Sequence, residues 1–313
     1  MNKGIFKTII YYDCLDYPLT SEELNIFSFE SGEGEIKRNL IELARGFHFL
    51  KGRKNLVETR NERNKIAEKK WGEALRVVRW LQTVPYIRLV FASGSLALRN
   101  TTKESDLDFL IIVKHGRIWL TRFLILVLLS LLGVRRKRGQ SAAPDKVCVN
   151  HFITDKSLYI PRKSIYTAQL YARLVPVMGD KKVMGDKKLL DDFCEANKWV
   201  GDYIIGWPEC LKNQKYKHDD IMIYHRKSKI SDLLEKILNM KLGDWAENIL
   251  RKYQLRRIKN YPLTYKPGGR VKADDESLEF HPNSPELRII EKYNKKMIEL
   301  GFGGLTEKSS FVK

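Results

Sequence analysis

The first sixty residues have hydrophobic spacing typical of short helices followed by a hairpin. Isoleucines and tyrosines recur at helical spacing through residues 3–14 and predict an amphipathic helix. Thr20 precedes a serine and two glutamates, a sequence that predicts the start of a second short helix. We expect a third helix at 35–44, then a hairpin whose strands are 47–50 and 56–59. The pattern therefore predicts three helices and one hairpin.

The middle of the chain changes from helical to extended patterning. Residues 61–82 carry apolar side chains on one helical face and predict a long amphipathic helix. Three mainly apolar runs then predict strands at 86–93, 106–113 and 147–153. A strongly apolar segment, 118–134, connects the second and third strands. Because a crossover helix belongs between two such strands, we expect 118–134 to be a buried helix.

The chain beyond residue 156 has a helical pattern. Residues 228–258 predict one long basic helix, or a helix pair interrupted near Gly243. Residues 260–286 are rich in proline, glycine and aspartate and predict a loop. A helix at 285–300 is expected to close the chain.

These elements predict an α/β (α+β) protein of three parts. Residues 1–60 form a winged-helix-like module in this interpretation, because helices followed by a hairpin are typical of a winged helix-turn-helix. Residues 61–84 are the connecting helix, 85–155 the α/β domain, and 156–313 a helical, basic C-terminal domain. A winged helix can bind nucleic acid, or it can pack and dimerise. Since residues 1–60 hold as many acidic as basic side chains, packing or dimerisation is favoured.

The charge of the chain indicates which partners it attracts. It contains 57 Lys and Arg against 38 Asp and Glu, a formal net charge of +19, all of it after residue 60. Such a chain is drawn to polyanions such as nucleotides, nucleic acid and acidic lipid. Hydrophobic residues make up 43% of the chain, which excludes a wholly disordered or fibrous protein.

The cysteines and the N-terminal sequence bear on the compartment. No two cysteines form a CxxC pair, and no secretory signal peptide is expected in the first residues. We therefore expect a reduced, cytoplasmic protein without a structural zinc site. The four cysteines are Cys14, Cys148, Cys194 and Cys210.

The apolar segment 118–134 also raises the question of a membrane helix. Its 17 residues include Arg122, and a helix that spans a bilayer needs about 20 apolar residues. An interfacial membrane helix is an alternative, but we expect a buried helix and no stable insertion into a membrane.

One constellation could support chemistry on phosphates. Gly94 and Ser95 follow the first predicted strand, and Asp106 and Asp108 open the next one. A Gly-Ser turn that opens a helix presents backbone N–H groups and a hydroxyl to phosphate oxygens. Residues two apart in a strand project from the same face, so the two carboxylates can hold Mg²⁺ together. The alternative is an ordinary turn followed by two solvent-facing aspartates.

This arrangement resembles the nucleotidyltransferases of the DNA polymerase beta superfamily. The resemblance rests on strand, Gly-Ser, short helix and Asp-x-Asp on the next strand, and it covers roughly residues 85–155. It implies that Gly94 and Ser95 contact the phosphates of an NTP. It also implies that Asp106 and Asp108 are catalytic and bind the metal, Mg²⁺ or Mn²⁺.

The third carboxylate of that family is missing from its expected place. The matching strand holds Asn150 at the position where the resemblance implies an acid, so Asn150 is the third candidate catalytic residue. A neutral amide weakens a metal site by one charge, which puts turnover in doubt more than nucleotide binding. Asp145 and Asp155 flank the strand and are alternative sources of the acid.

The remaining polar candidates carry less weight. We interpret His151 as a packed strand residue and His281 as part of a turn. The basic cluster 135–138 is either a phosphate contact or a solvated helix end. Basic residues among tyrosines in 211–275 suit RNA or DNA, or else an amphipathic bundle with solvated lysines.

The predicted function is metal-dependent transfer of a nucleoside monophosphate from an NTP to an acceptor. Two non-enzymatic alternatives stay open. One is a degenerate nucleotidyltransferase fold that binds nucleic acid, and the other is a regulatory winged-helix protein that senses nucleotide.

Overall fold

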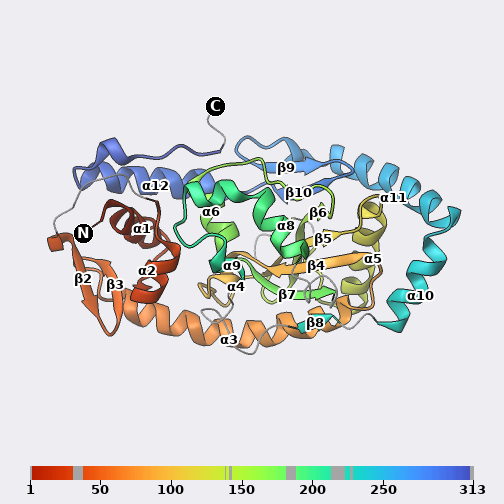
Figure 1. Cartoon of the computed structure of the whole chain (residues 1–313), viewed down its shortest axis with the longest axis horizontal. Coiled ribbons are helices and arrows are strands. Elements are labelled where there is room, and N and C mark those ends of the chain that lie inside the picture. Colours follow the sequence, from red (N-terminus) through yellow and green to blue (C-terminus); the bar gives the residue numbers. More distant parts are fainter. Residues whose placement is uncertain are drawn as a thin grey trace.

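The structure, a computed structural model, is organised around a mixed seven-stranded sheet (Figure 1). It describes residues 2–30, 38–137, 139–140, 143–180, 188–212, 223–225 and 228–310. The strand order is β8-β7-β4-β5-β6-β10-β9. The strands are β4 (Ile87–Ala92), β5 (Leu107–Val113), β6 (Val147–Thr154), β7 (Val175–Asp180), β8 (Ile223–His225), β9 (Arg270–Ala273) and β10 (Ser277–His281).

Helices cover both faces of this sheet. Strand β5 alternates its side chains, so Leu110 belongs to the core that residues of α1, α6 and α12 share, while Phe109 belongs to the core on the other face with residues of α3, α5 and α11. The helices are α1 (Lys3–Asp13), α2 (Ser21–Phe27), α3 (Leu56–Leu81), α4 (Gly94–Ala97), α5 (Ile118–Leu131), α6 (Ile165–Ala172), α8 (Lys188–Ala196), α9 (Glu209–Lys212), α10 (Lys229–Leu238), α11 (Lys241–Lys259) and α12 (Glu286–Glu299). The fold is therefore mixed α/β, as the sequence predicts.

The central strands and their crossover confirm the sequence prediction. Strand β4 pairs antiparallel with β5, and β5 pairs parallel with β6. Helix α5 makes the parallel connection, but it is buried on one side only: Ile118, Ile125 and Leu129 are buried, whereas Phe123, Val127 and Leu131 are exposed. In the part of the chain that the structure describes, no helix is long and apolar enough to cross a membrane.

The C-terminal part is not simply helical, and here the sequence prediction was wrong. Strands β7 and β8 extend the sheet beyond β4, while β10 and β9 extend it beyond β6. Residues 260–286, expected as a loop, contain β9 and β10. A boundary at residue 155 thus separates strands that the structure joins in one sheet. Strands β8, β9 and β10 are short, and β7 contains Pro176 and Gly179, so none of the four has the continuous apolar run that identifies β5.

The N-terminal part confirms two helices and corrects the hairpin. Helix α2 begins with a capping box in which the Thr20 side chain accepts from Glu23 N and the Glu23 carboxylate accepts from Thr20 N. The expected third helix is wrong for its described residues: a 3-10 turn (Arg38–Leu40) leads into strand β2 (Ile41–Ala44). The hairpin joins β2 to β3 (Phe47–Leu50), not residues 47–50 to 56–59.

Helix α3 and a small sheet connect this part to the rest. Helix α3 begins at Leu56, earlier than expected, and runs along the lower side of the molecule towards β8 (Figure 1). Strand β1 (Leu19–Thr20) pairs with β3, which gives a three-stranded sheet in the order β1-β3-β2. The winged-helix interpretation of residues 1–60 stays a prediction.

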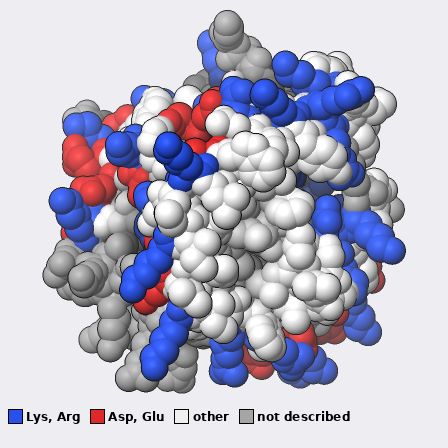
Figure 2. Space-filling model, turned by 90° about the vertical axis from the view of Figure 1, so that its right-hand side faces the viewer, with Lys and Arg blue, Asp and Glu red and all other residues white. Residues whose placement is uncertain are grey.

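The basic helix expected at 228–258 is a pair. Helix α10 ends at Leu238 and α11 begins at Lys241, close to the predicted break near Gly243. The pair forms the end of the molecule that faces the viewer in Figure 2.

Candidate functional site

The Gly-Ser turn lies directly against the Asp-x-Asp strand. Gly94 begins α4 with φ of +62°, a left-handed conformation that favours glycine. A Cβ atom built on Gly94 would lie 2.8 Å from Oδ2 of Asp108. The neighbouring Ser93 N–H donates to the main-chain oxygen of Asp108 at 3.0 Å. Because Gly94 has no side chain, the main chain of the turn can lie against the Asp108 carboxylate. Ser95, the next residue of the helix, is half-buried.

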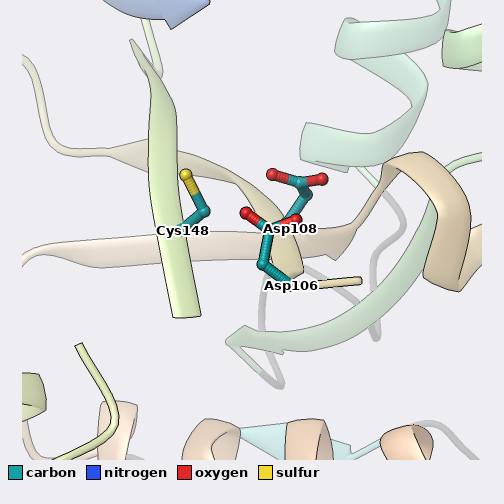
Figure 3. Close-up of side chains that lie close together, drawn as sticks. All are labelled: Asp106, Asp108 and Cys148. Carbon is teal, nitrogen blue, oxygen red and sulfur yellow. The ribbon is translucent and has the colours of Figure 1, made fainter. Parts of the chain in front are cut away.

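Asp106 and Asp108 project together at the start of β5 (Figure 3). Their carboxylates and the Sγ of Cys148 on β6 offer three ligand atoms that all lie within 4.8 Å of one another. All three residues are partly exposed. The predicted juxtaposition of Asp106 and Asp108 is thus present, and Cys148 is an addition that sequence reasoning missed.

The two carboxylates repel each other electrostatically. Burial, followed by the negative charge of Asp106, raises the pKa of Asp108 to about 6. Three smaller effects lower the pKa of Asp108: the charge of His281, a hydrogen bond from Asn150 and the charge of Arg136. Asp108 is therefore mainly ionised at neutral pH and lies beside a second carboxylate. A bound cation would reduce the repulsion between the two negative charges.

Arg136 supplies one such positive charge. Its Nη1 donates a short hydrogen bond to Oδ2 of Asp106 and lies 3.9 Å from Sγ of Cys148. The sequence left the basic cluster 135–138 as a phosphate contact or a solvated helix end. In the structure Arg136 lies at the site rather than at a solvated helix end, because the segment after α5 folds back beside the start of β6. The phosphate contact stays a prediction.

Asn150 lies on β6, two residues after Cys148. Its Nδ2 donates to Oδ1 of Asp108 at 3.0 Å, so the residue expected at the third position does contact the Asp pair. The β5–β6 register shifts between Asp108 and Leu110, which gives β6 one extra residue across the site.

The alternative acids lie elsewhere. Asp145 accepts from Lys70 Nζ at 2.6 Å, and Asp155 accepts from the His115 N–H at 2.8 Å. Neither belongs to the cluster that contains Asp106 and Asp108.

Strand β10 brings a buried charged group that the sequence did not predict to this side of the sheet. Burial raises the pKa of Glu279, but His281, His151 and Arg270 lower it to about 2, so Glu279 stays ionised. Its Oε1 lies 2.9 Å from Nε of Arg270 and 3.5 Å from Nδ1 of His281. His281 was expected in a turn, but it is the last residue of strand β10. The centroid of its ring lies 6.2 Å from that of the His151 ring.

His151 itself behaves as a packed residue. Burial lowers its pKa to about 4, so its ring is neutral at neutral pH. Its Nδ1 lies 3.3 Å from the hydroxyl of Tyr171, which is also buried. The prediction that His151 is a packed strand histidine is confirmed.

The donor set fits a hard divalent cation. Mg²⁺ and Mn²⁺ prefer oxygen ligands, and Mg²⁺ commonly takes one or two carboxylates together with phosphate and water oxygens. Asp106 and Asp108 supply the carboxylates. Burial and the charges of Asp108 and Asp106 raise the pKa of Cys148, so its thiol stays protonated and is a poor ligand for such a cation.

Comparisons with protein-family models, curated proteins and solved structures find no match to this chain.

Proposed function

We propose that the chain is a metal-dependent nucleotidyltransferase that transfers a nucleoside monophosphate from an NTP to an acceptor. The observation that carries the proposal is the close approach of Gly94 to Asp108, where an added Cβ would lie 2.8 Å from the carboxylate. This approach places two groups side by side: a turn that can bind phosphates and a pair of carboxylates that can bind metal.

Each residue has a role in this proposal. Asp106 and Asp108 hold Mg²⁺ or Mn²⁺, which when bound neutralises charge on the triphosphate. Gly94 and Ser95 orient the triphosphate through backbone N–H groups and the Ser95 hydroxyl. Arg136 pairs with Asp106 in the structure. When metal binds the carboxylates, the Arg136 side chain can form its ion pair with a phosphate oxygen instead.

A second candidate function is supported by the same site. Asn150 presents its amide nitrogen to Asp108, and Arg136 already neutralises Asp106. A site with these partners can bind nucleotide without turning it over. This favours a degenerate nucleotidyltransferase fold that senses nucleotide or binds nucleic acid.

Calorimetry tests the site assignment. We expect the wild type to bind nonhydrolysable NTPs in the presence of Mg²⁺, and Asp106→Ala with Asp108→Ala to lose this binding while keeping the wild-type circular dichroism spectrum. Asp192→Ala with Asp202→Ala removes the same charge from exposed positions and is the matched control. Unchanged binding by the Asp106 and Asp108 variant contradicts the assignment.

Pyrophosphate release separates the two functions. A metal-dependent nucleotidyltransferase releases pyrophosphate from an NTP when an acceptor is present. Nucleotide binding without pyrophosphate release, over a broad panel of acceptors, supports the sensing or binding function instead.

A further inference from the structure

Helices α10 and α11 turn apolar side chains outward. Residues of α10, of α11 and of the turn between them each expose 45 to 68% of their surface, and they recur at helical spacing along one side of each helix. We call this set the apolar face: Ile230, Leu233, Ile237, Met240, Leu242, Trp245, Ile249 and Tyr253.

The inward side of the α10 helix makes polar contacts to the body of the molecule. Glu235 Oε1 accepts from the Tyr86 N–H at 2.8 Å and lies 3.4 Å from Nη1 of Arg88. The buried Ser231 hydroxyl lies 3.5 Å from the main-chain oxygen of Val84. Helix α10 is thus attached to the body through these hydrogen bonds and through the half-buried Leu234 and Leu238. Its other apolar side chains, Ile230, Leu233 and Ile237, are exposed.

The inward side of helix α11 combines apolar and polar contacts, because Leu250, Leu255 and Ile258 pack in the core beside two polar side chains. The buried Glu247 accepts from the N–H groups of Trp119 at 3.0 Å and Leu120 at 2.7 Å. Gln254 Nε2 donates to the main-chain oxygen of Trp119 at 2.8 Å. Amphipathic helices ordinarily bury their apolar side against the core. An apolar side turned outward therefore indicates a surface that another apolar phase covers.

Basic side chains surround the apolar face. Figure 2 shows this end of the molecule as a broad area without charged residues, whose border is mostly Lys and Arg with some Asp and Glu. On α10 and α11 the exposed acidic residue is Asp244, which pairs with Arg117 at 2.6 Å. The exposed basic residues of the two helices are Lys229, Lys236, Lys241, Lys252, Arg256, Arg257 and Lys259.

We propose that the apolar face docks on the surface of a membrane that contains anionic lipid. The aliphatic residues and Trp245 enter the boundary between headgroups and acyl chains, while the basic residues contact lipid phosphates. Tryptophan and tyrosine favour this boundary because one end of each ring is apolar and the other is polar. Helix α5, which packs on α11, exposes Phe123, Val127 and Leu131 and can extend the contact.

Charge argues for a membrane over the two macromolecular occupants. A second copy of a chain with net charge +19 would bring like charges together around the apolar face. Nucleic acid offers phosphates to the basic border but nothing to cover isoleucines and leucines. An anionic bilayer matches both the apolar centre and the basic border.

Vesicle sedimentation with the full-length chain tests the proposal. We expect binding to vesicles of phosphatidylcholine with phosphatidylglycerol, weaker binding to phosphatidylcholine alone, and loss of the difference at high salt. Trp245→Ser with Ile249→Ser should weaken binding at least about tenfold, because two large side chains no longer enter the lipid. Leu43→Ser with Ile298→Ser removes two side chains that are each 62% exposed on other elements, and it should bind as the wild type does.

A charge variant tests the border independently. Lys252→Glu with Arg256→Glu should weaken binding to anionic vesicles at least about thirtyfold, because the loss of two basic residues alone costs about 2 kcal/mol at about 1 kcal/mol each. Lys65→Glu with Lys69→Glu on α3 makes the same charge change and should have a smaller effect. All four residues are exposed, so the variants should melt as the wild type does.

Several outcomes would overturn the proposal. They are equal binding to both kinds of vesicle, equal losses in the apolar variant and its control, or no vesicle binding at all. Light scattering that shows a dimer abolished by Trp245→Ser would assign the apolar face to a second copy. Binding of single-stranded RNA that the same variant abolishes, without vesicle binding, would assign it to nucleic acid.

Discussion

Single residues at the site carry two requirements at once. Gly94 must adopt a positive φ and must leave space for the Asp108 carboxylate, and only glycine meets both. A comparison with Gly116 separates the effect of backbone strain from the effect of the contact with Asp108. Gly116 has a similar φ of +73°, but no atom lies within 4 Å of the place where its Cβ would be.

We expect Gly94→Ala to impair nucleotide binding as well as stability. Both Gly94→Ala and Gly116→Ala should lower the free energy of unfolding by about 1–2 kcal/mol, because alanine is strained in the left-handed region. Only Gly94→Ala should also displace Asp108 and weaken calorimetric binding of Mg²⁺ with an NTP analogue. Equal binding by the two variants would show that the turn does not need to approach the carboxylate.

The proposed metal site can be tested at Asn150, which donates a hydrogen bond to Asp108. We expect Asn150→Asp to raise affinity for Mn²⁺ about tenfold or more, since one added charge at contact distance contributes about 1–4 kcal/mol. Without metal, the third carboxylate should lower the melting temperature because it repels Asp108. Calorimetric titration with Mn²⁺ and thermal melts with and without metal measure both effects. An unchanged affinity would mean that Asn150 is not the third position.

The residues of the candidate site that could be predicted are those that a local motif or the family resemblance marks, the latter including Asn150. Gly94 follows β4, while Asp106 and Asp108 lie at the start of β5, and the connection between the two strands is short, so spacing alone indicates that they meet. Arg136 and His281 come from a segment after α5 and from the end of β10. Their positions depend on which strands pair, and a local pattern does not encode that information.

Buried ion pairs hold several elements together in the N-terminal part. Glu23 of α2 lies 3.1 Å from Arg60 of α3 and 3.1 Å from Arg173 after α6. The Tyr17 hydroxyl also donates to Glu23 at 2.8 Å. Burial raises the pKa of Glu23, but Arg60 and Arg173 lower it to about 2.

We expect Glu23→Gln to cost about 3 kcal/mol of unfolding free energy at neutral pH, because two buried guanidinium groups lose their counter-charge. A lowered carboxyl pKa contributes stability above its unfolded value of 4.5, and this contribution is lost as the pH falls towards 2. The difference between wild type and variant in chemical denaturation should therefore shrink over that range. The exposed Glu22→Gln is the control, and an equal effect there would contradict this role.

The elements that could be predicted are those with strong local signals. The apolar runs of β4, β5 and α5, and the capping box of α2, specify their own conformations. Strand β10 pairs with β6 and β9 although it lies in a segment rich in turn-forming residues. Its conformation is set by the neighbouring strands, so its own sequence does not reveal it.

The whole molecule joins segments that are far apart in the chain. The core on one side of the sheet contains Phe6 of α1, Leu110 of β5 and Met297 of α12. Strand β4 is covered by β7 on its outer edge, and β6 is covered by β10. The region that resembles a nucleotidyltransferase domain therefore depends on residues outside it for both of its edges.

This dependence has a direct consequence for the isolated region 85–155. We expect that fragment to lack a cooperative thermal transition, because β4 and β6 lose their outer neighbours and the sheet loses α3 and α11 from one face. The full-length chain should instead unfold with one transition that includes the N-terminal helices, since they share a core with the sheet. Calorimetry and amide NMR spectra of both proteins measure the difference. A dispersed spectrum and a sigmoidal melt from the fragment would show that these strands form an independent domain, as the sequence pattern alone predicts.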